Sequence, residues 1–176
     1  MTKVHLPSPE ESLGFWVYRL HIQGTAALRR AFQTSGFDLT PEQWGVLVRL
    51  REQEGINQNQ LGERAFKDRH NITRILKRLE RQGYVERRSD PRDRRVCHIF
   101  LTATGCSVQE ELTPVVLRHR RDMVRGIPRE DLAATRGILE RIVGNIERGG
   151  VRGEKGKPGR KAVGNGCAKQ ITDEDL

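Results

Sequence analysis

Between residues 57 and 101 the spacing of apolar positions changes from helical to alternating, which predicts two short helices followed by a β-hairpin. Leu61 and Ala65 share one face of the first expected helix. In the second, over residues 69–82, apolar residues recur at helical spacing: Ile72, Ile75, Leu76 and Leu79. Such a stripe predicts that this face is buried and that the opposite, polar face meets solvent or a partner.

The residues at the ends of these segments support the same interpretation. Asp68 is a favoured N-cap residue for the second helix, and Gly83 stands where a C-cap favours the left-handed conformation. Residues 84–88 and 96–101 have strand patterns, and the turn SDPRDRR joins them. The sequence therefore predicts a winged helix-turn-helix whose hairpin tip carries Arg92, Arg94 and Arg95.

Helical patterns also flank this module. Ser12 precedes an apolar face that reaches about Phe32, and Thr40-Pro41-Glu42 begins a second helix. Thr102 begins a long helix through about Arg125, which we expect Pro114 to bend. Pro128 begins the last helix, with apolar spacing to Ile146. The predicted fold is mainly α with a small β-hairpin wing (α+β).

The apolar surplus of the outer helices exceeds what so small a winged helix can cover, which suits a two-fold contact between identical chains. We therefore expect an N-terminal dimerisation helix in residues 1–40, the winged helix-turn-helix module in residues 41–101 and C-terminal dimerisation helices in residues 102–148. Residues 149–176 are rich in Gly and Lys with hardly any periodic apolar residues. This composition predicts a disordered basic tail.

Positive charge is concentrated in the predicted module. Residues 64–95 hold twelve Lys and Arg against five Asp and Glu, a net +7 of the chain's +9. A sequence pI near 10.1 favours a polyanionic partner. A helix fits the major groove of DNA, and an arginine-rich hairpin suits the negative minor groove. The alternative is that residues 69–77 form only a polar outer face and that the winged helix binds a protein.

Three stretches carry a resemblance to a known family: LTPEQWGVLVRL, LGERAFKDRHNITRILKRLERQGYVER and SDPRDRRVCHIFLTATG. In order and spacing they resemble the MarR family of bacterial transcription regulators over about residues 10–147. The most specific part is Asp93-Arg94-Arg95 shortly before the run from Leu101 to Gly105. The resemblance implies a homodimeric, ligand-responsive protein that binds double-stranded DNA.

The resemblance also nominates site residues. It implies that the helix starting at Arg69 enters the major groove and the wing enters the minor groove, with Asp93 orienting Arg95. The candidate DNA-binding residues are Arg69, His70, Asn71, Thr73, Arg74, Lys77, Arg92, Asp93, Arg94 and Arg95. The sequence differs from the family's commonest pattern at residues 69–71, where small hydroxylated residues are frequent. This difference affects which operator sequence is recognised and not the DNA-binding role of the helix.

A small aromatic or anionic ligand is a further expectation, because the resembled family binds such compounds between its dimer helices and its DNA module. The candidate ligand-binding residues lie on helices that could line such a cleft: Trp16, His21, Trp44 and His119. Each of them has an alternative role in the core or on the surface. No cofactor is implied.

The cysteines and histidines give no metal motif, because the sequence contains no Cys-x-x-Cys pair and no helical His-x3-His. Cys97 alternates with Ile99 and Leu101 and is expected in the core. Cys106 lies near a helix N-terminus, which can activate a thiol, so it is the better redox candidate. The resembled peroxide sensors carry a reactive cysteine where this chain has Gly14, so their mechanism is not carried over.

Catalytic motifs such as a phosphate loop or GxSxG are lacking, so an enzyme is not expected. The sequence has no run of about 18 apolar residues and its N-terminus lacks the apolar core of a secretory signal, as is typical of a cytoplasmic protein.

The favoured hypothesis is a MarR-type repressor that binds a pseudo-palindromic operator as a homodimer and is released by a ligand. A thiol redox regulator, using Cys106 or Cys97, and a sequence-neutral architectural protein remain as alternatives.

Overall fold

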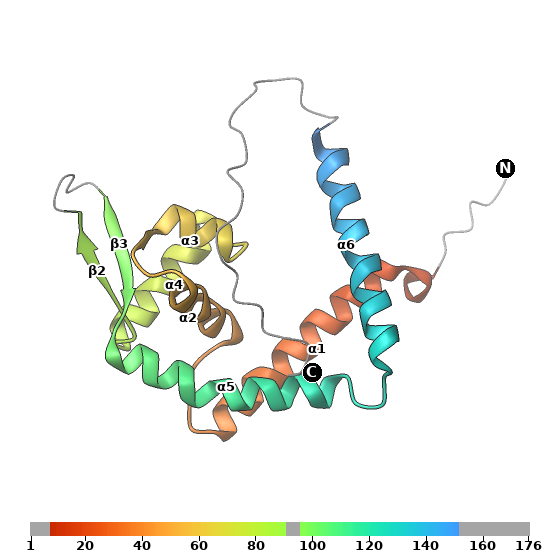
Figure 1. Cartoon of the computed structure of the whole chain (residues 1–176), viewed down its shortest axis with the longest axis horizontal. Coiled ribbons are helices and arrows are strands. Elements are labelled where there is room, and N and C mark those ends of the chain that lie inside the picture. Colours follow the sequence, from red (N-terminus) through yellow and green to blue (C-terminus); the bar gives the residue numbers. More distant parts are fainter. Residues whose placement is uncertain (1–7, 91–95, 152–176) are drawn as a thin grey trace. The chain divides into compact units, whose positions relative to one another are not determined.

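The computed structural model describes residues 8–90 and 96–151. This part of the chain is mostly helical with one small sheet, as the sequence predicts (Figure 1). It falls into two units, residues 1–123 and 124–176, and each is described by itself. The expected tail begins at residue 149, but helix continues to Val151, and the rest of the tail lies outside the described residues.

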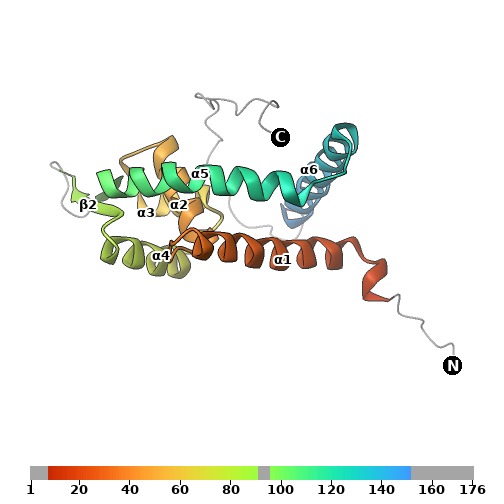
Figure 2. The ribbon, with the colours of Figure 1, turned by 90° about the horizontal axis from the view of Figure 1, so that it is seen from below.

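Two long helices contact each other in the first unit. After a short 3-10 turn, η1 (Pro9–Glu11), α1 (Leu13–Thr34) lies beside α5 (Ala103–Met123), and the two run antiparallel (Figure 2). Ser12 is the N-cap residue of α1, but its side chain makes no capping bond. Pro114 lies inside α5, which remains one continuous element.

Helix α2 (Pro41–Glu52) begins where the sequence predicts. Thr40 and Gln43 form a capping box: the Gln43 amide N–H donates to Thr40 Oγ1 at 3.2 Å, and the Thr40 amide N–H donates to Gln43 Oε1 at 2.8 Å. These bonds satisfy donors that the first helical turn leaves unpaired. The apolar face of α2 is buried in the core through Val46, Leu47 and Leu50.

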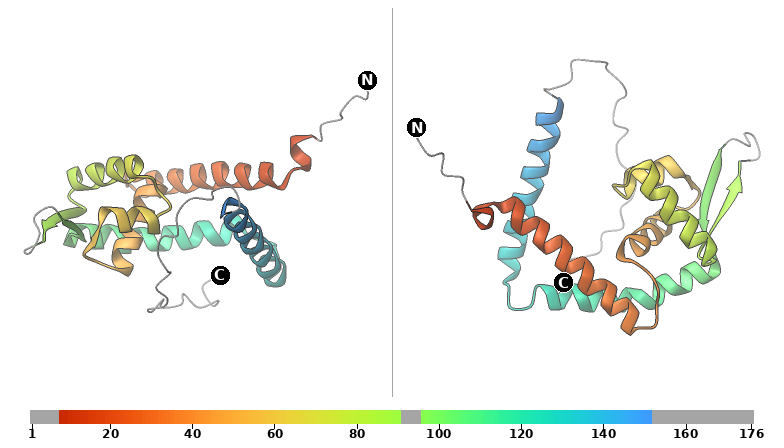
Figure 3. Two further views of the ribbon diagram at one scale, coloured as in Figure 1. Left: turned by 90° about the horizontal axis from the view of Figure 1, so that it is seen from above. Right: turned by 180° about the vertical axis from the view of Figure 1, so that it is seen from behind.

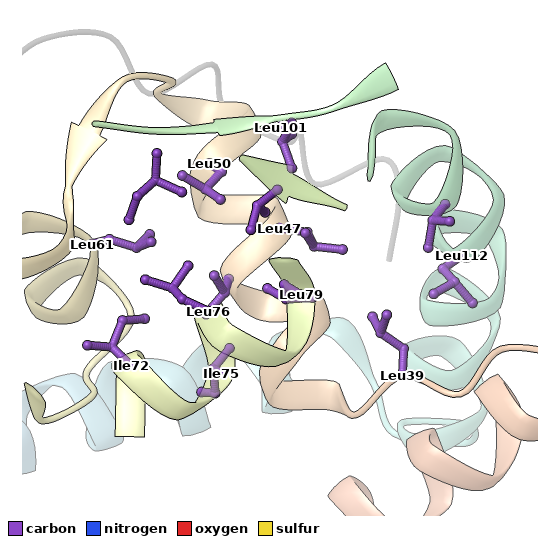
Figure 4. Close-up of a cluster of buried hydrophobic side chains, with 14 of the residues drawn as sticks. Leu39, Leu47, Leu50, Leu61, Ile72, Ile75, Leu76, Leu79, Leu101 and Leu112 are labelled. Carbon is purple, nitrogen blue, oxygen red and sulfur yellow. The ribbon is translucent and has the colours of Figure 1, made fainter. Parts of the chain in front are cut away.

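The helix-turn-helix consists of α3 (Gln58–Arg64) and α4 (Arg69–Arg81). Its core is a cluster of leucines and isoleucines from α2, α3 and α4, which point toward one another in Figure 4. Phe66, in the turn between the helices, has a φ of 52° and is 89% exposed. A left-handed conformation is uncommon for phenylalanine, so the packing of the two flanking helices, and not the backbone preference of Phe66, holds this turn.

The wing is part of a three-stranded antiparallel sheet with strand order β1-β3-β2, and it extends beside α3 and α4 (Figure 3). The predicted hairpin is present as β2 (Val85–Ser89) and β3 (Cys97–Leu101). The short strand β1 (Ile56–Asn57) is not predicted from the sequence, because two residues are too few to show an alternating pattern. Ile56 pairs with Ile99, which ties the start of the helix-turn-helix to the wing.

Glycine is required where the wing meets α5. A Cβ at Gly105 would lie 2.0 Å from the backbone carbonyl oxygen of Tyr84, so no side chain fits there. That carbonyl accepts a hydrogen bond from the Thr102 amide, and Thr102 Oγ1 donates to the Gly83 carbonyl at 2.6 Å. The strand-to-helix junction is therefore a close backbone contact, and Gly83 itself has the expected positive φ of 71°.

The second unit contains one described helix, α6 (Arg129–Val151). It begins beside Pro128 as predicted, and its apolar side chains Ile138, Val143 and Ile146 are exposed. None of the helices in residues 8–90 and 96–151 has the length and apolar content needed to cross a membrane.

The Gly105 contact predicts opposite effects for two Gly→Ala substitutions. Gly105→Ala should lower the free energy of unfolding by about 2 kcal/mol or more, because backbone must move to admit the methyl group. Gly45→Ala should raise it by about 0.5 to 1 kcal/mol, because Gly45 lies within α2 with nothing within 4 Å of its Cβ position. Equilibrium urea unfolding measures both, and equal stability of the two variants would contradict this account of the junction.

Candidate nucleic-acid interface

Helix α4 presents one apolar and one basic face. Ile72, Ile75, Leu76 and Leu79 are buried, as the sequence predicts. Between them the helix exposes the candidate DNA-binding residues Arg69, His70, Asn71, Arg74 and Lys77. Because the apolar stripe fixes the rotation of the helix, these five side chains are directed away from the core together.

Asp68 caps this helix and also orients one of the candidates. Its carboxylate accepts from the Asn71 backbone N–H at 2.8 Å and from Asn71 Nδ2 at 2.7 Å. The hydrogen bond from the Asn71 backbone N–H is the main cause that lowers the pKa of Asp68, and the bond from the Asn71 side chain adds to it. The Asn71 amide is therefore held at the helix N-terminus, and its contact with a base requires that it exchange or share this bond.

Thr73 is half-buried, and its hydroxyl is already engaged. Thr73 Oγ1 donates to the Arg69 carbonyl at 2.6 Å and accepts from Gln58 Nε2 at 2.6 Å. Of the six candidates on α4, Thr73 is thus the one whose polar group holds α3 against α4. Its methyl group remains the part suited to an apolar contact with DNA.

The cations of the module divide into paired and unpaired sets. Many lie within 4 Å of a carboxylate, including Lys67 with Glu42, Arg78 with Asp38, Arg87 with Glu80 and Arg88 with Glu86. By contrast, the side chains of Arg69, Arg74 and Lys77 make no hydrogen bond or ion pair with the residues the structure describes. Unpaired cations gathered on one helix face are suited to a polyanion.

These unpaired side chains line an open hollow of about 670 Å³ on the outer face of α4. It is formed by Arg69, His70, Thr73, Arg74, Lys77 and Arg81. Arg81 is not among the candidates predicted from the sequence, although it continues the same face of α4 one turn beyond Lys77. Among the described residues its lining includes no carboxylate, so the hollow favours anions.

The wing tip falls outside the described residues, and with it the candidates Arg92, Asp93, Arg94 and Arg95. At the base of the hairpin the Asp90 amide donates to the Val96 carbonyl at 2.9 Å. His98, on β3, contacts both sides of this base: Nε2 lies 3.0 Å from Asp90 Oδ2, and Nδ1 lies 2.7 Å from the Gly55 carbonyl oxygen. The wing is thereby joined to the segment that precedes α3.

Both neighbours of the His98 ring are acceptors, so both ring nitrogens must carry a proton for the two bonds to form together. The hydrogen bond to Asp90, followed by that to Gly55, raises the pKa of His98. Arg88 stands opposite His98 in the pairing of β2 with β3, but its charge is offset by Glu86. The folded protein therefore favours the imidazolium form.

Comparisons with known proteins agree with this geometry. The MarR family profile matches residues 37–96, which contain both helices of the helix-turn-helix and the wing strand β2. The transcriptional regulator TtmR of Methylorubrum extorquens is 32% identical over 136 residues, covering 69% of this chain and 70% of TtmR. The chain belongs to the MarR family.

Solved structures share the fold as well. A probable transcriptional regulator from Pseudomonas aeruginosa superposes with a TM-score of 0.71 at 27% identity, covering 77% of this chain and 99% of that one. BpsR of Bordetella bronchiseptica superposes with a TM-score of 0.72 at 22% identity, covering 79% and 98%. This MarR-family protein is thus a DNA-binding transcriptional regulator and not an enzyme.

The four candidate ligand residues of this MarR-family protein occupy different surroundings. Trp16 is half-exposed beside Phe15, and Trp44 is half-buried against Phe32, so the two indoles belong to separate aromatic pairs. His21 is exposed on α1, and His119 is half-buried on α5. The Trp44 indole N–H is buried without a hydrogen-bond partner among the described residues, which leaves a donor available at that point.

Neither described cysteine forms a disulfide. Cys97 is half-buried rather than in the core, because it is the first residue of β3, at the end of the hairpin away from the buried Ile99 and Leu101. Cys106 is half-buried, packs against the core and lies beside Arg51. The pKa of Arg51 is raised, mainly by its contact with Cys106 and further by its contact with Glu110. Cys167 lies outside the described residues. Within the described part of the chain no cluster of His, Cys, Asp or Glu is suited to a metal.

The division of the cations predicts different roles for two arginines one turn apart on α4. Arg74→Ala should cost about 1 to 3 kcal/mol of binding to a specific duplex, because its unpaired guanidinium faces the outer hollow. Arg78→Ala is the matched control: it loses the same charge, but Arg78 is paired with Asp38 at 2.7 Å. Fluorescence anisotropy measures both affinities, and equal losses would contradict the assignment of the interface.

The His98 contacts predict a pH-dependent stability. The pKa of His98 is higher in the folded protein than in the unfolded chain, where it is about 6.5. The protonated His98 ring therefore stabilises the fold fully below the unfolded pKa, and this stabilisation is lost as the pH rises through the folded pKa. His98→Gln should therefore be less stable than the wild type at pH 6, and the difference should shrink by pH 9. Urea unfolding across this range measures it. A difference independent of pH would show that the imidazolium is not the stabilising form.

Proposed function

We propose that this MarR-family protein is a repressor that binds a pseudo-palindromic operator as a homodimer and is released by a small ligand. In this proposal residues 41–101 bind DNA, and residues 1–40 and 102–148 form the dimer. The observation that carries the proposal is the unpaired basic face of α4.

Base recognition is assigned to the first turns of α4. A helix in the major groove reaches base edges with its N-terminal residues, where Arg can contact guanine and Asn can contact adenine. Arg69, His70, Asn71 and Arg74 are exposed at this end of the helix, and Lys77 follows one turn later. Arg92, Arg94 and Arg95 are proposed to enter the minor groove, with Asp93 orienting Arg95.

Dimerisation is supported by apolar side chains left exposed outside the DNA-binding module. On α1 they are Leu13, Trp16, Val17, Tyr18, Leu20 and Ile22. On α6 an open hollow of about 520 Å³ is lined largely by apolar atoms of Leu132, Leu139 and Val143. Soluble monomers rarely expose apolar surfaces of this extent, and an isologous contact would cover them in both chains.

A two-fold dimer accounts for how a ligand could control binding. Two α4 helices must lie about one helical turn of DNA apart, roughly 34 Å, to enter successive major grooves. A ligand that binds better to a dimer with another spacing shifts the population away from DNA. BpsR of Bordetella bronchiseptica offers a precedent, since 6-hydroxynicotinic acid regulates its DNA binding.

The proposed ligand is a small aromatic or anionic compound, with Trp16, His21, Trp44 and His119 as candidate contacts. Trp44 has the strongest support, because its buried indole N–H is available as a donor. Trp16 already donates its indole N–H to the Glu10 carbonyl at 2.8 Å. Trp44→Phe removes the donor while keeping the ring, so it is the variant that tests a polar contact to a ligand.

Hydroxyl-radical footprinting tests the operator proposal directly. The DNA is the region upstream of the gene for this protein and of its neighbours. A repressor dimer should protect two equivalent patches about one helical turn apart, related by a two-fold axis. Protection spread evenly along the DNA would favour the architectural alternative, since only a regulator keeps a large ratio of specific to non-specific affinity.

The dimer proposal makes a prediction about truncation. A chain that ends before Pro128 lacks α6 and should be monomeric or aggregated, because the apolar surface that α6 covers in the partner becomes exposed. A chain that ends after Val151 keeps α6 and should remain a dimer. Sedimentation equilibrium distinguishes these states. A full-length chain that is a monodisperse monomer at micromolar concentration would contradict the proposal.

The thiol alternative rests on the contact of Cys106 with Arg51. Under the ligand proposal, a variant with Cys106→Ser and Cys167→Ser should bind DNA as the wild type does, with or without peroxide. If mild peroxide released the wild type, a reducing agent restored binding and Cys106→Ser abolished the response, redox control would replace ligand control.

A further inference from the structure

A second hollow lies at the junction of α3, α4 and the wing strands. Its volume is about 360 Å³, and its polar lining includes Gln58, Asn59, Arg69 and Arg87. None of the described residues that line it is acidic. The site is distinct from the outer face of α4, and Arg69, at the first position of α4, lines both hollows.

Arg87 reaches this hollow from β2 in a fixed orientation. Its Nε donates to Glu80 Oε1 at 2.7 Å, and its Nη1 donates to Gln58 Oε1 at 3.2 Å. Gln58 is held in turn by its bond to Thr73. Two bonds define the plane of the guanidinium, while Nη2 has no hydrogen-bond partner among the described residues.

The charge balance of the hollow favours an anion. Glu80 offsets the charge of Arg87 but does not line the hollow, so Arg87 contributes directed N–H donors more than net charge. Arg69 supplies the net charge, because its guanidinium has no partner in the described part of the chain. A planar guanidinium with a free N–H edge is well suited to phosphate oxygens.

The geometry of duplex DNA indicates which anion reaches this position. The major and minor grooves are separated by a sugar-phosphate strand. If α4 occupies a major groove and the wing the adjacent minor groove, the strand between them must pass the junction of α4 and the wing. The hollow lined by Arg69 and Arg87 lies at that junction.

We propose that this hollow binds one backbone phosphate of the DNA between the two grooves, with Arg87 and Arg69 as its ligands. The inference rests on the proposed placement of α4 and the wing. Gln58 and Glu80 act as positioning residues, because they hold the Arg87 guanidinium. Through the bond of Gln58 to Thr73, the phosphate site is also joined to the recognition helix, so that one phosphate fixes both elements in register on the duplex.

The neighbouring residues of β2 provide a matched pair for the test. Arg87 lines the hollow, whereas Arg88 pairs with Glu86 and lies over the Phe100 ring, 4.5 Å from its centroid. The DNA is a duplex enriched from random sequence by the wild-type protein, and Arg87→Gln and Arg88→Gln are compared on it. Arg87→Gln should weaken binding roughly tenfold and lower the salt slope by about one phosphate contact, and Arg88→Gln should do neither.

Neutral methylphosphonate linkages, placed one at a time, then locate the phosphate. For the wild type and Arg88→Gln, one linkage per half-site between the two grooves should weaken binding. For Arg87→Gln that linkage should cause no further loss, because the interaction is already absent. Additive losses from the linkage and from Arg87→Gln at every position would overturn the proposal. A wild type that enriches no sequence would instead contradict the proposed function.

Two controls keep the outcome interpretable. Thermal unfolding should show Arg87→Gln folded, and if it is not, Arg87→Lys replaces it. Lysine keeps the charge but lacks the planar guanidinium that bonds Glu80 and Gln58 and presents Nη2 to the hollow. With Arg87→Lys the methylphosphonate effect should be reduced, and an unchanged effect would overturn the role of the guanidinium.

Inorganic phosphate should not bind the free protein at millimolar concentration. Phosphate binding that is lost in Arg87→Gln and competes with DNA would assign the hollow to a free anion instead.

Discussion

The burial of one apolar stripe of α4 is the constraint on which the interface depends. Ile72, Ile75, Leu76 and Leu79 pack among the leucines of α2 and α3, and this packing fixes the rotation of α4. Each of these side chains contributes roughly 1.5 to 3 kcal/mol through burial. A rotation of the helix would bury arginines and expose isoleucines, so the outward direction of Arg69, Arg74 and Lys77 follows from the core.

On α4, ion pairing then distinguishes Arg78, which is held by Asp38, from the unpaired cations that are proposed to meet DNA. Some of the cations that neighbour a carboxylate join elements to one another, as Arg78 does between α4 and the segment before α2, whereas Arg88 pairs with Glu86 within β2. Within the described part of residues 41–101, the cations whose side chains have no partner, Arg69, Arg74 and Lys77, lie on the outer face of α4. A charge count along the sequence cannot make this distinction, because it weights Arg78 and Arg74 equally.

The sequence predicted the α-helices, the side-chain caps at Thr40 and Asp68 and the two wing strands, because these depend on local patterns. The Ser12 side chain, in contrast, makes no capping bond. The sequence missed β1 and placed Cys97 in the core, because both depend on tertiary packing. It also did not reveal that the Thr73 hydroxyl is engaged or that Arg87 is oriented by Gln58 and Glu80. Those contacts join residues 15, 29 and 7 positions apart, which no periodicity reports.

Selection of bound duplexes from random-sequence DNA by the wild-type protein tests the central claim most directly, namely that the exposed face of α4 recognises DNA sequence in a two-fold assembly. The account predicts enrichment of one two-fold symmetric sequence, with half-site centres about 10 base pairs apart and the most constrained bases where α4 enters the major groove. Enrichment of no sequence, or of a single site without a symmetric mate, would contradict it.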